Sequence, residues 1–94
     1  MVQVKLFGNL RQHSGRLILN ASGSTVGEVL QDLCATYPSL AEAIFNGDHL
    51  QAYVRVMING HDIELAEGLN TLVKDSDQIA IFPPMAGGVA LVTL

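Results

Sequence analysis

One amphipathic segment, residues 25–37, restricts the fold of this chain more than any other feature. Thr25 and Glu28 have the spacing of a capping box, in which each side chain satisfies a backbone N–H group of the first helical turn. An apolar stripe follows at helical spacing, formed by Val26, Val29, Leu30, Leu33 and Tyr37. Pro38 then ends the helix. Because a single apolar stripe must be buried against another element, the rest of the chain has to supply an apolar surface for this helix to cover.

Two strand patterns precede the helix. Residues 2–7 alternate apolar and polar side chains, which predicts a strand with one buried face, and Gly8-Asn9 ends it. Residues 16–20 are short and rich in residues that favour strands. We expect these two strands to pair back on each other through a polar loop that is longer than a tight turn.

Three further strands are predicted after the helix. Residues 53–58 and 62–65 are joined by Asn59-Gly60, which is the strongest short-range hairpin signal in the chain. Residues 78–82 form an apolar run that suits a central strand. The two prolines that follow lack backbone N–H groups, so the strand must end there.

A second, shorter helix is predicted over residues 39–45, with Ser39 as its capping residue and Asn46-Gly47 as the turn that closes it. The predicted fold class is therefore α+β, a mixed sheet of about five strands packed on one main helix plus a short helix. A length of 94 residues with 49% hydrophobic content suits one small domain with one core.

The charge balance narrows the class of partner. Nine acidic residues against five Lys and Arg residues give a formal net charge of −4, which argues against nucleic acid. The longest apolar stretches fall far short of the roughly 20 residues that span a bilayer, so no membrane partner is expected. The single cysteine cannot form an internal disulfide and the chain opens without a leader-like segment, so we expect a cytoplasmic protein.

The sequence holds no recognisable catalytic or metal-binding pattern. His13, His49 and His61 lie far apart without ligand spacing, so we expect loop histidines and no metal. Cys34 lies beside the apolar stripe and is expected to be a buried, inert thiol. The acidic residues are scattered over caps, turns and the outer helix face, where solvation explains them.

The unusual segment is the last one, FPPMAGG at residues 82–88. Together with VKLFG near the start and STVGEVL at the helix, it resembles the MoaD/ThiS family of ubiquitin-like sulfur carriers, and within that family MoaD, the molybdopterin synthase small subunit. The resemblance covers residues 2–88. It implies a ubiquitin-like β-grasp domain over residues 1–84 and a flexible C-terminal tail over residues 85–94.

The resemblance also implies a chemistry for the tail. The carboxylate of Gly88, preceded by Gly87, would be adenylated by an E1-like enzyme that uses ATP, and then converted to a thiocarboxylate. The sulfur would pass to a precursor such as a pterin on the molybdopterin synthase large subunit or on another sulfur-accepting enzyme. In some relatives the activated terminus is instead joined to lysines. The carrier would bind no cofactor and would not be catalytic alone, although it could be the small subunit of a sulfurtransferase.

The residue types of the tail suit this role. Glycine has no Cβ, so a Gly-Gly end can enter another protein's active site closely and turn freely. Pro83 and Pro84 stiffen the stem and hold the tail away from the domain. Phe82, Met85 and Ala86 complete the predicted partner-binding set, because aromatic and methionine side chains suit an adaptable apolar interface.

A six-residue extension, residues 89–94, departs from the pattern. An internal Gly88 has no free carboxylate, so the chain would be a precursor that needs cleavage of the Gly88-Val89 bond; the resemblance implies a JAMM metalloprotease. The alternative is that the glycines form a loop and the extension adds an edge strand, reaching about 20 Å when extended. The protein would then be a non-catalytic interaction module that self-associates through its tail.

Overall fold

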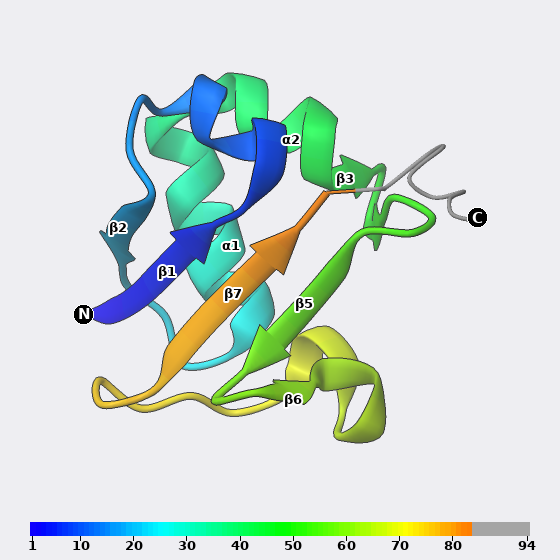
Figure 1. Ribbon diagram of the computed structural model, residues 1–94. Coiled ribbons are helices and arrows are strands. Elements are labelled where there is room, and N and C mark those ends of the chain that lie inside the picture. Colours follow the sequence, from blue (N-terminus) through cyan, green and yellow to red (C-terminus); the bar gives the residue numbers. More distant parts are fainter. Residues whose placement is uncertain (84–94) are drawn as a thin grey trace, which may run out of the picture.

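Residues 1–83 are described by the computed structural model, and they form a five-stranded mixed sheet backed by two helices (Figure 1). The order of strands across the sheet is β2-β1-β7-β5-β6. Their bounds are β1 (Val2–Leu6), β2 (Ile18–Ala21), β5 (Arg55–Ile58), β6 (His61–Asp62) and β7 (Gln78–Phe82). β7 pairs parallel with β1 and antiparallel with β5, so the strand expected to be central is central. The α+β class and the mixed sheet of five strands are confirmed.

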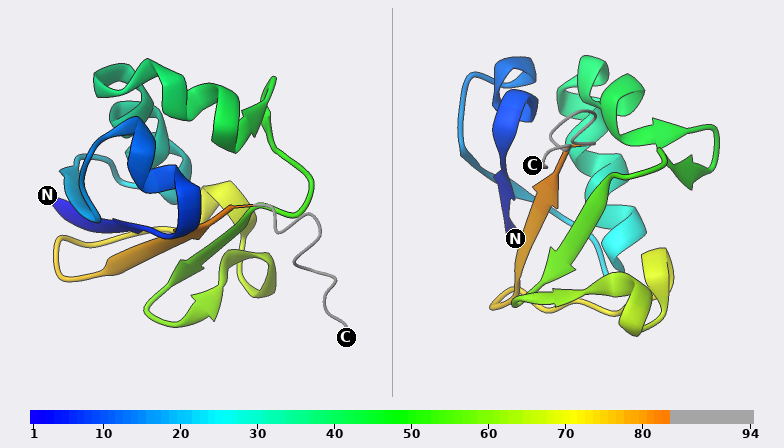
Figure 2. Two further views of the ribbon diagram at one scale, coloured as in Figure 1. Left: turned by 45° about the horizontal axis from the view of Figure 1, so that its top comes forward. Right: turned by 45° about the vertical axis from the view of Figure 1, so that its right-hand side comes forward.

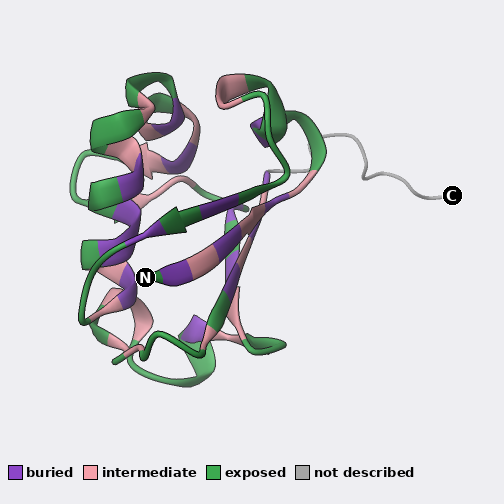
Figure 3. Cartoon of the chain, turned by 90° about the vertical axis from the view of Figure 1, so that its left-hand side faces the viewer, coloured by how far each residue is buried: buried purple, intermediate pink, exposed green. Residues whose placement is uncertain are grey.

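Both helices lie on one face of the sheet and leave the other face open (Figures 1 and 2). α1 (Val26–Thr36) packs along the sheet, and the short α2 (Pro38–Ile44) follows it. The core lies between these layers, and Figure 3 shows the buried side of α1 turned toward the strands. In β1 the buried side chains of Val2, Val4 and Leu6 alternate with half-buried Gln3 and Lys5, as the period of two predicted. Burial of one such Val or Leu contributes about 1.5–3 kcal/mol.

The capping box at the start of α1 is present, with one difference from the expected geometry. The backbone N–H of Glu28 donates to Thr25 Oγ1 at 3.1 Å. The Glu28 carboxylate reaches one residue further back than predicted and accepts from the backbone N–H of Ser24 at 2.8 Å. The Thr25 and Glu28 side chains thus each accept a backbone hydrogen bond at the start of α1, so the helix start was predicted correctly.

Two predictions about local structure were wrong. The expected strand at residues 62–65 is only β6, because the Asp62 side chain accepts a hydrogen bond from the Glu64 backbone N–H and turns residues Ile63–Leu65 into a 3₁₀ helix, η2. Ser39 does not cap α2. Pro38 begins that helix instead, because a proline at the first position loses no helical hydrogen bond.

Several short elements were not predicted. A 3₁₀ helix, η1 (Gly8–His13), fills the connection between β1 and β2, and another, η3 (Gly68–Asn70), follows η2. After α2, a small separate hairpin is formed by β3 (Phe45–Asn46) and β4 (His49–Leu50). These pieces are too short for periodicity to reveal.

The strand expected at residues 53–58 begins two residues late, at Arg55. Tyr53 has φ +71°, which no strand residue adopts, and it lies in the turn before β5. The boundary between domain and tail expected after residue 84 stays a prediction, because residues 84–94 lie outside those described.

Candidate functional site

The candidate site is the point at which the chain leaves the sheet, at the end of β7. The Phe82 ring stacks on Phe7, with 4.6 Å between ring centroids and 8° between planes. The backbone N–H of Phe7 donates to the Ile81 carbonyl at 3.0 Å, which continues the parallel pairing of β1 and β7 to its end. The end of β7 is therefore fixed by a backbone bond at Ile81 and an aromatic contact at Phe82.

Pro83 is buried against Gly8 directly after that stack. A Cβ atom added to Gly8 would lie 2.7 Å from Pro83 Cγ, closer than side-chain contacts allow. Gly8 also has φ +61°, in the left-handed region that favours glycine. Pro83 was predicted to face a partner, and in the structure it anchors the tail to the domain.

The open face of the sheet adjoins this exit point. Strand register places five residues in one row across it, in the order Ile18, Lys5, Ala80, Met57 and Asp62. The Phe7–Phe82 stack lies one step along the same strands, toward the exit point. The row and the stack together make a largely apolar face, which we call the open-face patch.

Charge on the open-face patch is uneven. Arg55 donates to Asp62 at 2.8 Å, so this cation is matched. The hydrogen bond from the Glu64 backbone, followed by that from Arg55, holds the pKa of the Asp62 carboxyl below its ordinary value. Half-buried Lys5 has no ion-pair partner among residues 1–83. The patch thus offers one unmatched positive charge.

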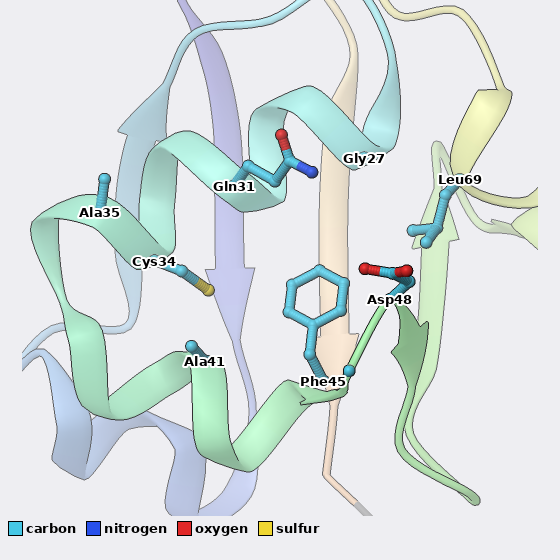
Figure 4. Close-up of a pocket in the computed structure, with 9 residues that line it drawn as sticks. Gly27, Gln31, Cys34, Ala35, Ala41, Phe45, Asp48 and Leu69 are labelled. Atoms are coloured by element: carbon cyan, nitrogen blue, oxygen red, sulfur yellow. The ribbon is translucent and has the colours of Figure 1, made fainter.

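On the opposite side, a groove of about 540 Å³ lies between α1, α2 and the β3–β4 hairpin (Figure 4). The Cys34 sulfur points into it, near Phe45 and Ala41. Cys34 is half-buried, so the expectation of full burial was wrong, and desolvation raises the pKa of its thiol. A raised pKa lowers the thiolate fraction, which agrees with the expected inert character.

The histidines form no site together. His13 shares a hydrogen bond of 2.9 Å with Ser39 Oγ, which joins η1 to α2, while His49 and His61 are exposed. Among residues 1–83 no group of three or more His, Cys, Asp or Glu side chains is placed to hold a metal ion.

Of the predicted site residues, Phe82 and Pro83 lie in the described part of the chain and adjoin each other at the exit point. The others, Pro84, Met85, Ala86, Gly87, Gly88 and Val89, lie outside it. Sequence reasoning missed Phe7, Gly8 and Lys5 as parts of the site. The alternation in residues 2–7 could have placed Phe7 and Lys5 on one face, but only the parallel partner strand shows that this face leads to Phe82.

Comparison with known proteins identifies the family. The model of the ThiS family matches residues 4–88, which cover all of the sheet except the first two residues of β1, both helices and the Gly-Gly pair. The chain belongs to the ThiS family. Membership places it among the ubiquitin-like sulfur carriers, which confirms the general class expected from the sequence.

Individual relatives agree with this assignment. The chain is 35% identical over 83 residues to the sulfur carrier protein CysO of Mycobacterium tuberculosis, covering 84% of this chain and 89% of CysO. It resembles the solution structure of small archaeal modifier protein 1 from Methanosarcina acetivorans, with TM-score 0.83, 44% identity and coverage of 93% and 95% of the two chains. A chain in the crystal structure of the Amycolatopsis orientalis BexX/CysO complex gives TM-score 0.86 and 30% identity, with 94% and 100% covered. The ubiquitin-like β-grasp fold is thereby confirmed.

The length and apolar content of a helix decide whether it can cross a membrane. None of the helices formed by residues 1–83 has the length and apolar character needed to cross a bilayer.

Proposed function

We propose that this chain is the precursor of a sulfur carrier whose working group is the carboxylate of Gly88, freed by hydrolysis of the Gly88-Val89 bond. The observation that carries the proposal is the exit point. Phe82 stacked on Phe7 and Pro83 seated on Gly8 direct the chain out of the sheet beside the open-face patch, five residues before Gly88. A partner that docks on this patch therefore has the glycines within its reach.

In the proposed reaction the carrier itself supplies no acid–base group. The Gly88 carboxylate attacks the α-phosphate of ATP on an E1-like enzyme, and pyrophosphate leaves. Sulfide then attacks the acyl carbon of the adenylate, AMP leaves, and the terminus becomes a thiocarboxylate. The activating enzyme supplies the nucleotide site and the acid–base groups, while the carrier supplies a docked domain and a thin, positioned end.

The open-face patch is the proposed docking surface for the activating enzyme. Its apolar side chains suit a desolvated interface core, and Lys5 would be costly to bury without an opposite charge. The partner is therefore expected to present a carboxylate to Lys5. The complex of BexX with CysO, a protein similar to this chain, supports the view that such carriers work by docking.

The proposed sulfur acceptor is a small-molecule precursor on a separate enzyme, with the pterin precursor of molybdopterin as the first candidate. The name of one group of relatives favours a second fate of the activated terminus, to be tested beside sulfur transfer. Small archaeal modifier proteins, one of them 37% identical over 65 residues, are named as modifiers, so a lysine amine of another protein could attack the activated Gly88 carbonyl and form an amide, with AMP as the leaving group.

The test compares the chain ending at Gly88 with the full chain of 94 residues, each incubated with the E1-like enzyme of the same genome, ATP and sulfide. We expect intact-mass analysis to show exchange of one terminal oxygen for sulfur in the shorter chain alone. The full chain should react only after a JAMM protease of that genome has trimmed it. If the shorter chain yields neither acyl-adenylate nor thiocarboxylate, the proposed function is wrong.

One observation favours a second candidate, the self-associating module. β2 is an edge strand, and Leu17 and Ile18 beside its free edge are exposed. An added strand could pair there and cover both side chains. Analytical ultracentrifugation distinguishes the two, since this module predicts that the full chain is a dimer or larger and that removal of residues 89–94 makes it monomeric.

A further inference from the structure

We propose that Tyr53 is a docking anchor for the enzyme that activates Gly88, an inference that rests on the proposed function. Tyr53 was read from the sequence as the start of a strand. The structure instead places it in the turn between β4 and β5, two residues before the strand residue that pairs with Phe82.

The side chain of Tyr53 is 82% exposed, which is unusual for a large aromatic residue. Its backbone is unusual as well, since φ is +71°. Within residues 1–83 the only other residue besides glycine with positive φ is Asn59, and asparagine tolerates that region far better than tyrosine does. The fold thus holds a bulky side chain in a strained turn from which the core gains nothing.

The turn itself is firmly held. The backbone N–H of Val54 donates to the Gln51 carbonyl at 3.1 Å, and Val54 is buried. Gln51 is fixed in turn, because its backbone N–H donates to Ile44 and its side-chain amide donates to the Phe45 carbonyl at 3.1 Å. Tyr53 occupies the third position of this turn, where a positive φ calls for glycine or asparagine. The surrounding bonds keep the tyrosine in place despite the strain.

The location connects Tyr53 to the tail. Two residues further on, Arg55 pairs across the sheet with Phe82, the last residue of β7. On the other side, Ala52 and Pro83 line the same hollow of about 350 Å³. Tyr53 therefore flanks the exit point on the side of β5, while the Phe7–Phe82 stack lies toward β1.

The chemistry of the tyrosine side chain indicates what kind of pocket on the partner would bind it. A rigidly presented tyrosine loses little conformational entropy on binding, and its ring and hydroxyl suit a pocket that is apolar with one hydrogen-bond acceptor at its end. We infer that the activating enzyme carries such a pocket next to its nucleotide site. Burial of Tyr53 there would fix the direction in which the tail enters.

Replacement of Tyr53 by glycine separates this role from a structural one. In Tyr53→Gly the strain at φ +71° disappears, so the thermal midpoint of the isolated chain should rise by about 3 °C. Affinity for the activating enzyme, measured by titration calorimetry with the chain ending at Gly88, should fall about tenfold, the usual scale for loss of an aromatic anchor. A residue with only a structural role would not give opposite changes in stability and binding.

Two controls complete the test. Tyr53→Phe keeps the ring and should bind within about threefold of the original chain, since a hydrogen bond is worth less than the buried ring area. Leu72→Ala shortens a residue that is 76% exposed and whose backbone forms a bridge with Thr25, before α1, and it should leave affinity unchanged. Unchanged binding by Tyr53→Gly, with normal thiocarboxylate formation by the original chain, would overturn the anchor and leave the proposed function standing.

Discussion

Two features favour glycine at position 8, the left-handed backbone and the close contact with Pro83, and their contributions to stability can be separated experimentally. A Gly8→Ala change adds a Cβ atom both at φ +61° and against the Pro83 ring. The left-handed backbone costs about 1–2 kcal/mol for an alanine, and the contact adds to this. We expect the free energy of unfolding in urea to fall by about 2–3 kcal/mol.

Gly15 provides the matched control for this prediction. It has φ +76°, but a Cβ atom there would have nothing within 4 Å. Gly15→Ala should therefore show the backbone cost of about 1–2 kcal/mol alone. Equal losses in both variants would mean that the contact between Gly8 and Pro83 does not anchor the tail.

The same residues show what sequence reasoning can reach at this scale. Phe82 was predicted as a site residue because it borders an unusual local motif, and it lies at the exit point. Gly8 was read only as the end of a strand, because its close contact is with a residue that lies 75 positions later in the chain and no local pattern records that. The turn position of Tyr53 was missed for a related reason. Residues 53–58 favour strands by composition, whereas hydrogen bonds of Gln51 and Val54 hold Tyr53 in a turn.

At the scale of elements, the β5–β6 hairpin depends on one carboxylate. Asp62 accepts hydrogen bonds from the Glu64 backbone and from Arg55, which joins the hairpin to η2. Its pKa is lowered in the folded protein, so its contribution to stability is present above the unfolded pKa of about 3.9 and is lost as pH falls through the folded value.

A pH series tests this contribution. Thermal midpoints of the original chain should fall between about pH 5 and pH 2, and part of that fall should be missing in Asp62→Ala, which should already be less stable at pH 7. Asp75→Ala serves as the control, because Asp75 is exposed and pairs only with the terminal ammonium of Met1 among residues 1–83. If both variants keep the full acid dependence, the Asp62 bonds contribute little.

Elements with a strong local signal were predicted and those without one were not. The α1 capping box and stripe, the alternation of β1 and the proline stop after β7 are all encoded within a few residues. The error at residues 62–65 arose because their alternating pattern suits a strand, whereas one aspartate side chain closes a 3₁₀ turn there. At Ser39, too, one neighbouring residue decided the local structure, because Pro38 begins α2 and leaves Ser39 inside the helix.

Across the whole molecule, charge is divided along the chain. Lys5, Arg11 and Arg16 lie in residues 1–27, which contain no Asp or Glu, and all nine acidic residues follow. These three cations belong to β1 and the connection to β2, at one side of the sheet, while Asp62 and Glu64 lie at the other, where Arg55 pairs with Asp62. On the open-face patch, Lys5 is the cation that a partner must match.

Reversal of this charge should impair docking without unfolding the protein. Lys5→Glu should weaken binding of the chain ending at Gly88 to the activating enzyme by tenfold or more, because like charges would then meet in a desolvated interface, on the order of 2 kcal/mol. Lys74→Glu makes the same charge change on an exposed loop and should have an effect within about twofold. Comparable losses for the two would assign the effect to net charge and remove the open-face patch as the docking surface.

The parallel pairing of β1 with β7 also has a mechanical consequence. The first strand begins at one end of the sheet and the strand that carries the tail leaves at the other, with four residue pairs in register between them (Figure 1). Tension applied between residues 1 and 83 would load this ladder lengthwise, so its hydrogen bonds would have to rupture together rather than unzip one at a time. A motor that threads the protein from its tail would meet its greatest resistance at the first step.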